Sequence, residues 1–162
     1  MKIDEVYKAI EGLTDSLPDL FGGVEIDFPF RGTSKPIGDW SDSSDMGMVI
    51  TGDGIGTKSG VYFFANPDGR VFYIGKAATL HHRVWGHVNT PISIDEKTKE
   101  FPNQKFRGDG CQEEIKSVIA GKALLGVATL SNADLAALVE VFLQTLHIKR
   151  TGNLPALNKQ IG

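Results

Sequence analysis

A small set of polar and aromatic residues has the side-chain types that hydrolysis of a phosphodiester requires. That reaction needs positive charge beside the phosphate oxygens, a group that takes a proton from water, and a cation that supports the leaving oxygen. Basic, phenolic and carboxylate side chains can meet these needs, and an amide can help to orient them. The candidates are Tyr62, Tyr73, Lys76, Arg83, His87, Glu140 and Asn158.

The two tyrosines lie in a predicted β-hairpin. Two β-rich runs in GVYFFANPDGRVFYIG flank the turn-forming residues 66–69. A turn centred on these residues would place Tyr62 opposite Tyr73 and Gly60 opposite Gly75. The small residues would then leave room for a substrate backbone. Simple aromatic packing of the two tyrosines is the alternative.

Arg83 and His87 lie on a predicted helix that Thr79 caps and that runs to about Val88. Residues four apart are neighbours on one helical face. The planar guanidinium of Arg83 offers a fork of donors that suits a phosphate. An ordinary solvated helix face is the alternative.

Glu140 is the only charged residue between Asp134 and His147 on a second predicted helix. This helix begins after Ser131 or Asn132, extends to about residue 148 and has a clear apolar face. An ordinary polar stripe is the alternative for Glu140.

Lys76 directly follows the second tyrosine strand, and Asn158 lies in the terminal loop after Pro155. Either a phosphate contact or a surface position suits the lysine. A turn-forming role is the alternative for the asparagine.

Further elements must position these residues. We predict a helix from residue 4 to about Gly12, a loop with one or two short strands over 22–59, a loop over 91–110, a helix over 111–120 and a buried strand over 123–130. The glycines of TGDGIGTKSG lack the spacing of a phosphate-binding loop and indicate a turn.

The ordered series of these motifs resembles the GIY-YIG nuclease family over residues 60–159. The residues that carry the resemblance are Gly60-Val61-Tyr62, Tyr73-Ile74-Gly75-Lys76, Leu80, Arg83, His87, Glu140, Pro155 and Asn158. The resemblance implies an α+β fold in which helices flank a small central antiparallel sheet. Residues 1–59 would then form an N-terminal helix and a loop-rich acidic extension, and residues 60–162 the nuclease core.

The resemblance also implies roles for the site residues. Glu140 would be the sole protein ligand of one Mg²⁺ or Mn²⁺ ion per active site, and Arg83 would stabilise the charge on the phosphate. Tyr62 would take the proton from water, with help from His87 or Lys76, although the identity of the base stays open.

Two further residues would act by position according to the same resemblance. Tyr73 would orient the reacting groups, and Asn158 would orient the phosphate or Glu140. The histidine after Arg83 favours a restriction-type enzyme that acts on double-stranded DNA as a homodimer.

Composition sets limits on the class of protein. The 162 residues are 41% hydrophobic and include one cysteine, which indicates one domain without an internal disulfide and predicts a cytoplasmic location with no membrane span. Residues 1–59 hold 5 basic and 11 acidic residues, which would repel DNA and favour a protein partner. A non-catalytic binding module and a non-specific nuclease or toxin are the alternative functions.

Overall fold

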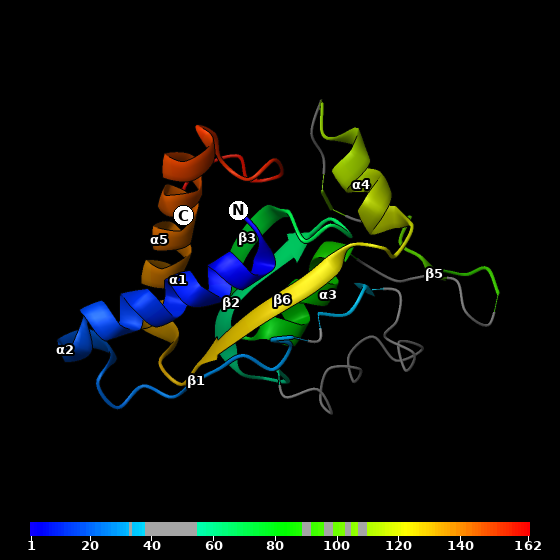
Figure 1. Cartoon of the computed structure of the whole chain (residues 1–162). Coiled ribbons are helices and arrows are strands. Elements are labelled where there is room, and N and C mark those ends of the chain that lie inside the picture. Colours follow the sequence, from blue (N-terminus) through cyan, green and yellow to red (C-terminus); the bar gives the residue numbers. More distant parts are fainter. Residues whose placement is uncertain (33, 38–54, 89–91, 96–98, 103–104, 107–109) are drawn as a thin grey trace.

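A four-stranded antiparallel sheet forms the centre of the computed structural model (Figure 1). The structure describes all residues except 33, 38–54, 89–91, 96–98, 103–104 and 107–109. The strand order is β1-β6-β2-β3, with β1 Ile26–Asp27, β6 Leu124–Leu130, β2 Ser59–Ala65 and β3 Val71–Ala77. β3 is therefore an edge strand of this sheet.

Helices cover both faces of the sheet. α1 (Ile3–Ser16) and α5 (Ala133–Thr151) pack on one face, and α3 (Leu80–Val88) packs on the other (Figure 1). The remaining elements are α2 Pro18–Phe21, α4 Gln112–Ile119 and the two-stranded pair β4 Ile92–Ser93 and β5 Lys99–Glu100. This arrangement confirms the predicted α+β fold.

The continuous apolar run of β2 is explained by the helices that cover both faces of the sheet. Val61 and Phe63 face α1 and α5, whereas Tyr62 and Phe64 face α3. All four side chains are fully buried. A strand that is buried on both faces reads as a continuous apolar run rather than as an alternation.

The register of the hairpin differs from the predicted one by two residues. A three-residue loop connects the strands, since the Asn66 amide donates to the Arg70 carbonyl at 2.9 Å, and Gly69 adopts a φ of 82°. A bulge lies next to the loop, because Ala65 pairs with Val71 and Phe64 with Tyr73, which leaves Phe72 without a partner on β2. Tyr62 consequently lies opposite Gly75, and Tyr73 opposite Phe64. The predicted pairing of Tyr62 with Tyr73 was wrong, although the two side chains do lie on one face of the sheet, the face that α3 covers.

Most helix predictions agree with the structure to within a few residues. α1 runs past Gly12 to Ser16, because its apolar side chains continue to pack on the sheet as far as Leu13. α5 ends at Thr151, where Gly152 takes the left-handed conformation. The loop predicted over 91–110 contains β4 and β5.

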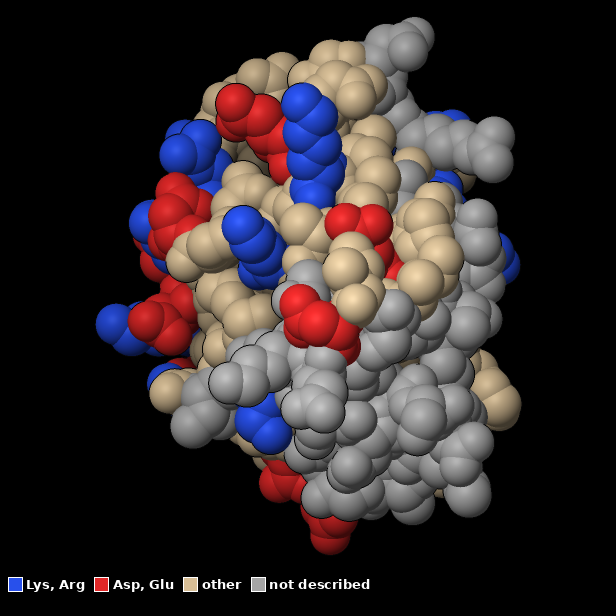
Figure 2. Space-filling model, turned by 90° about the vertical axis from the view of Figure 1, so that its right-hand side faces the viewer, with Lys and Arg blue, Asp and Glu red and all other residues tan. Residues whose placement is uncertain are grey.

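The acidic N-terminal segment contributes directly to the sheet. β1 pairs with β6, and the α1 carboxylates of Glu5 and Glu11 form ion pairs with Arg150 and Arg31. Charges of both signs are interspersed among the described residues on the face that Figure 2 shows. The division of the chain at residue 60 stays a prediction. Within the described part, no helix is long and apolar enough to cross a membrane.

Candidate active site

A polar cleft of about 400 Å³ lies at the edge of β3. Its walls come from β3, α3, α5 and the C-terminal segment. Six of the seven candidate residues line it: Tyr73, Lys76, Arg83, His87, Glu140 and Asn158. Residues far apart in the sequence are therefore brought together around one space, whereas Tyr62 is not among the lining residues.

Tyr73 and His87 form a hydrogen-bonded pair at the wall of this cleft. The Tyr73 hydroxyl lies 3.2 Å from Nε2 of His87. Burial, together with the charges of Arg83 and Lys105, lowers the pKa of His87 to about 4. The imidazole is therefore neutral at pH 7, and it can accept a proton from the phenol. Its Nδ1 atom is buried and has no hydrogen-bond partner in the described residues.

Tyr62 lies behind this pair. Its side chain is fully buried, and its ring centroid lies 5.8 Å from both the Tyr73 ring and the His87 ring. Burial and the neighbouring Tyr73 raise the pKa of the Tyr62 phenol. Burial also raises the pKa of the Tyr73 phenol. The difference between the two tyrosines is their position, because Tyr73 lines the cleft and the Tyr62 ring supports it from behind.

Gly75 provides the space that the Tyr62 ring occupies. A Cβ atom at this position would lie 2.9 Å from Cζ and Oη of Tyr62, and 2.9 Å from Cε1 of Tyr73. At Gly60, a Cβ atom would lie 2.1 Å from the Ala128 carbonyl oxygen. The predicted room for a substrate backbone is therefore filled by the protein itself at both glycines.

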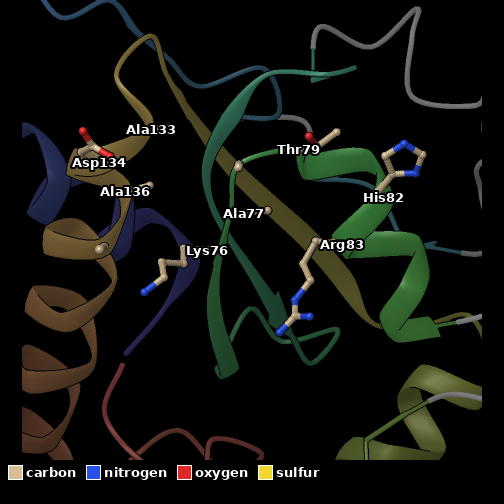
Figure 3. Close-up of a pocket in the computed structure, with 10 residues that line it drawn as sticks. Lys76, Ala77, Thr79, His82, Arg83, Ala133, Asp134 and Ala136 are labelled. Atoms are coloured by element: carbon tan, nitrogen blue, oxygen red, sulfur yellow. The ribbon is translucent and has the colours of Figure 1, made fainter.

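Two cations project into the cleft from different elements. Lys76 extends from the end of β3 and Arg83 from the exposed side of α3, and Figure 3 shows both pointing to the same side. Two cations that line one space could contact the same phosphate.

Sequence reasoning missed two more lysines that line the cleft, Lys105 and Lys159. Lys159 directly follows the candidate Asn158, which could have indicated it. The only sequence signal for Lys105 is its place in a polar segment.

Glu140 is a buried carboxylate at the floor of the cleft. The residue is 6% exposed, and its Oε2 atom lies 3.2 Å from Nζ of Lys76. The contact lacks hydrogen-bond geometry, and Oε2 has no hydrogen-bond partner in the described residues. A buried carboxylate oxygen that accepts no hydrogen bond and lies next to a polar cleft suits a hard divalent cation.

Glu140 would have to be supplemented by other ligands. No cluster of three or more His, Cys, Asp or Glu side chains that could hold a metal occurs in the described part of the chain. Water and phosphate oxygens would complete the coordination, as is usual for Mg²⁺.

Asn158 binds the backbone of β3. Its Oδ1 accepts from the Ile74 amide at 2.9 Å, and its Nδ2 donates to the Ile74 carbonyl at 2.7 Å. The neighbouring Leu157 amide donates to the Phe72 carbonyl at 2.9 Å. Asn158 thus fastens the C-terminal segment to the edge strand, and only one amide hydrogen remains for the cleft.

Residues 58–107 match the family model described as the UvrC-like GIY-YIG domain. The match includes both tyrosine strands and α3, and it ends before Glu140 and Asn158. The expected restriction-type branch is not supported, because the matching model is the UvrC-like one. No curated protein and no solved structure matches the chain.

Proposed function

We propose that this chain is a metal-dependent endonuclease, because residues 58–107 match the UvrC-like GIY-YIG domain model, and domains of this family are typically nucleolytic. Its reaction would be the hydrolysis of DNA phosphodiester bonds in the cleft beside β3. The convergence of six candidate residues on this cleft is the observation that carries the proposal.

The cations of the cleft would bind the scissile phosphate. Arg83 donates two parallel hydrogen bonds to phosphate oxygens and supports the charge that develops in the transition state. Lys76, Lys105 and Lys159 add positive charge around the same space. The net charge of −3 for the whole chain therefore does not oppose DNA binding at this position.

Tyr73 and His87 are the pair that we propose for proton transfer from water. Tyr73 lines the cleft, and its hydroxyl can pass a proton to neutral His87 as the phenol takes one from the attacking water. This assignment replaces the expected use of Tyr62, whose buried phenol does not line the cleft.

Glu140 is the residue that would hold the divalent metal. A bound Mg²⁺ or Mn²⁺ supplies positive charge next to the phosphate and the leaving oxygen. The buried Oε2 atom fits this use, and Lys76 neutralises the carboxylate in the structure described.

Cleavage of supercoiled plasmid and of single-stranded DNA tests the proposal. Wild-type protein should cut in Mg²⁺ or Mn²⁺ and not in EDTA. Glu140→Ala and Arg83→Ala should each lower the rate by about 100-fold or more. Glu113→Ala and Arg150→Ala are matched controls, because both residues are outside the cleft.

The pattern of products separates the remaining alternatives. Discrete bands on a large DNA indicate sequence specificity, whereas a smear indicates a general nuclease. DNA binding without cleavage, unchanged in Glu140→Ala and Arg83→Ala, would contradict the proposal and favour a non-catalytic binding module.

A further inference from the structure

A second hollow, of about 690 Å³, lies directly beside the cleft. It opens between the N-terminal turns of α3 and α5, next to the end of β3 (Figure 3). Lys76 and Arg83 line both spaces. A DNA strand whose phosphate lies between these two cations would therefore extend from the cleft into the hollow.

The walls of the hollow differ from those of the cleft. Small apolar side chains form much of the surface, contributed by Ala77, Ala78, Ala133, Ala136 and Ala137. Methyl groups offer no charge to a phosphate, but they pack well against the faces of a sugar or a base. The volume is in the range of pockets that hold small organic ligands.

Asp134 is the acidic residue that lines the hollow, where Thr79 and His82 are the polar lining residues besides the two cations. Figure 3 shows it on α5, apart from Lys76 and Arg83. Asp134 is exposed, and in the part of the chain that the structure describes its carboxylate has no hydrogen-bond or ion-pair partner. It repels a phosphate and accepts hydrogen bonds from N–H groups. A nucleotide would thus direct its phosphate to the cations and its base toward Asp134.

We propose that the hollow binds the nucleoside next to the scissile phosphate and that Asp134 reads its base by accepting hydrogen bonds. The proposal rests on the proposed nuclease function. Guanine presents two adjacent donors, N1–H and the N2 amino group, to the two carboxylate oxygens. Thymine presents a single imino N–H between two carbonyl oxygens. The geometry therefore favours guanine over thymine at this position.

Base pairing in a duplex already uses these guanine donors. The base that enters the hollow must therefore be unpaired, as in a single strand, a flap or a flipped nucleotide. This requirement defines the substrate class as DNA with an unpaired nucleotide beside the cut.

Oligonucleotides with one cleavable linkage test this inference. The nucleotide on each side of that linkage is varied in turn as guanosine, thymidine or an abasic residue, in single strands and in fully paired duplexes. At one of the two positions, the abasic residue should lower kcat/KM about tenfold or more, and guanosine should exceed thymidine about fivefold. Fully paired duplexes should be cut more slowly than single strands.

Two variants connect these effects to the hollow. Asp134→Asn should remove the preference for guanosine. Ala133→Trp fills the hollow from an exposed position and should lower cleavage of the guanosine substrate to the rate of the abasic one. Leu138→Trp is the matched control, because Leu138 is 37% exposed on α5 and does not line the hollow. It should leave the rates unchanged.

Failure of this inference differs from failure of the proposed function. Equal rates for guanosine, thymidine and abasic substrates, with active wild-type protein, would overturn the inference alone. If the protein cuts none of them, the nuclease function fails, and fluorescence anisotropy of the labelled oligonucleotides then decides. Equal binding of the guanosine and abasic strands would overturn the inference in that case.

Discussion

Lys76 Nζ lies 3.2 Å from Glu140 Oε2 and joins the edge strand of the sheet to the long C-terminal helix. The lysine side chain is 43% exposed, whereas that of the glutamate is 8% exposed. A carboxylate in this position is costly without a neighbouring cation. Lys76 supplies that charge here, and a metal on Glu140 would release Lys76 toward the phosphate.

Removal of this cation should destabilise the protein in a metal-dependent way. Lys76→Met leaves the Glu140 carboxylate without its neighbour, so we expect a loss of about 1–2 kcal/mol in the free energy of unfolding in EDTA, reduced because the lysine is partly exposed. Mg²⁺ should restore most of the loss, since ligands of the native state stabilise it. Urea unfolding in EDTA and in Mg²⁺ measures both effects.

Lys116→Met is the control for this measurement, because Lys116 is exposed on α4. Equal stability of Lys76→Met and wild type in EDTA would show that Glu140 does not need this lysine.

The free energy of unfolding should fall in mild acid because of the buried His87 imidazole. Its pKa is about 4 in the folded protein and 6.5 in the unfolded chain, so below pH 6.5 the unfolded state binds a proton that the folded state excludes. Above pH 6.5 the imidazole is neutral in both states and contributes nothing. Between pH 6.5 and 4 the loss is on the order of 3 kcal/mol.

Urea unfolding of wild type and His87→Gln at pH 7.5 and pH 4.5 isolates this effect from other titrating groups. The wild type should lose more stability than the variant over this interval. Parallel losses in the two proteins would show that His87 titrates normally.

Much of the site could be predicted from the sequence, because helical spacing and motif order are local features. Arg83 and His87 lie on one helix, as their spacing predicts, and both line the cleft. Glu140 is the only charged residue between Asp134 and His147 on an apolar helix, and the structure buries it. The selection of these residues as candidates required only local sequence patterns.

The remaining features depend on contacts through space. The predicted register of the hairpin was wrong because a three-residue loop and a bulge shift β3 relative to β2. The turn sequence alone specifies neither the loop length nor the bulge. Tyr62 is fully buried, with the rings of Phe64, Tyr73 and His87 near its own, and no local pattern indicates this environment. Lys105 is held near the cleft by a contact with a residue distant in the sequence, because its amide donates to the His87 carbonyl at 2.7 Å.

Substitution of Gly75 should displace the neighbouring rings of Tyr62 and Tyr73. In Gly75→Ala the new methyl group would lie 2.9 Å from atoms of both Tyr62 and Tyr73, so the rings must shift. We expect a loss of about 1–3 kcal/mol in the free energy of unfolding, as for other overpacked cores. Thermal or urea unfolding measures this change.

Gly12→Ala is the matched control for Gly75→Ala. Gly12 lies inside α1, where an added Cβ meets nothing within 4 Å. The control should be stabilised by about 0.5–1 kcal/mol, because alanine favours the helix more than glycine does. A similar effect of both substitutions would contradict a specific role for Gly75.

The contribution of the Asn158 side chain to anchoring the C-terminal segment can be measured by substitution. Asn158→Ala removes the acceptor of the Ile74 amide and one donor to the Ile74 carbonyl. We expect faster hydrogen exchange of the Ile74 and Leu157 amides and a loss of about 1–3 kcal/mol in stability, since each hydrogen bond contributes about 1 kcal/mol. The Phe63 amide in the centre of the sheet should exchange as in wild type.

Asn153→Ala is the control for Asn158→Ala, because in the described chain only the backbone of Asn153 forms hydrogen bonds. Unchanged exchange at Ile74 in Asn158→Ala would contradict the role of this side chain as the anchor.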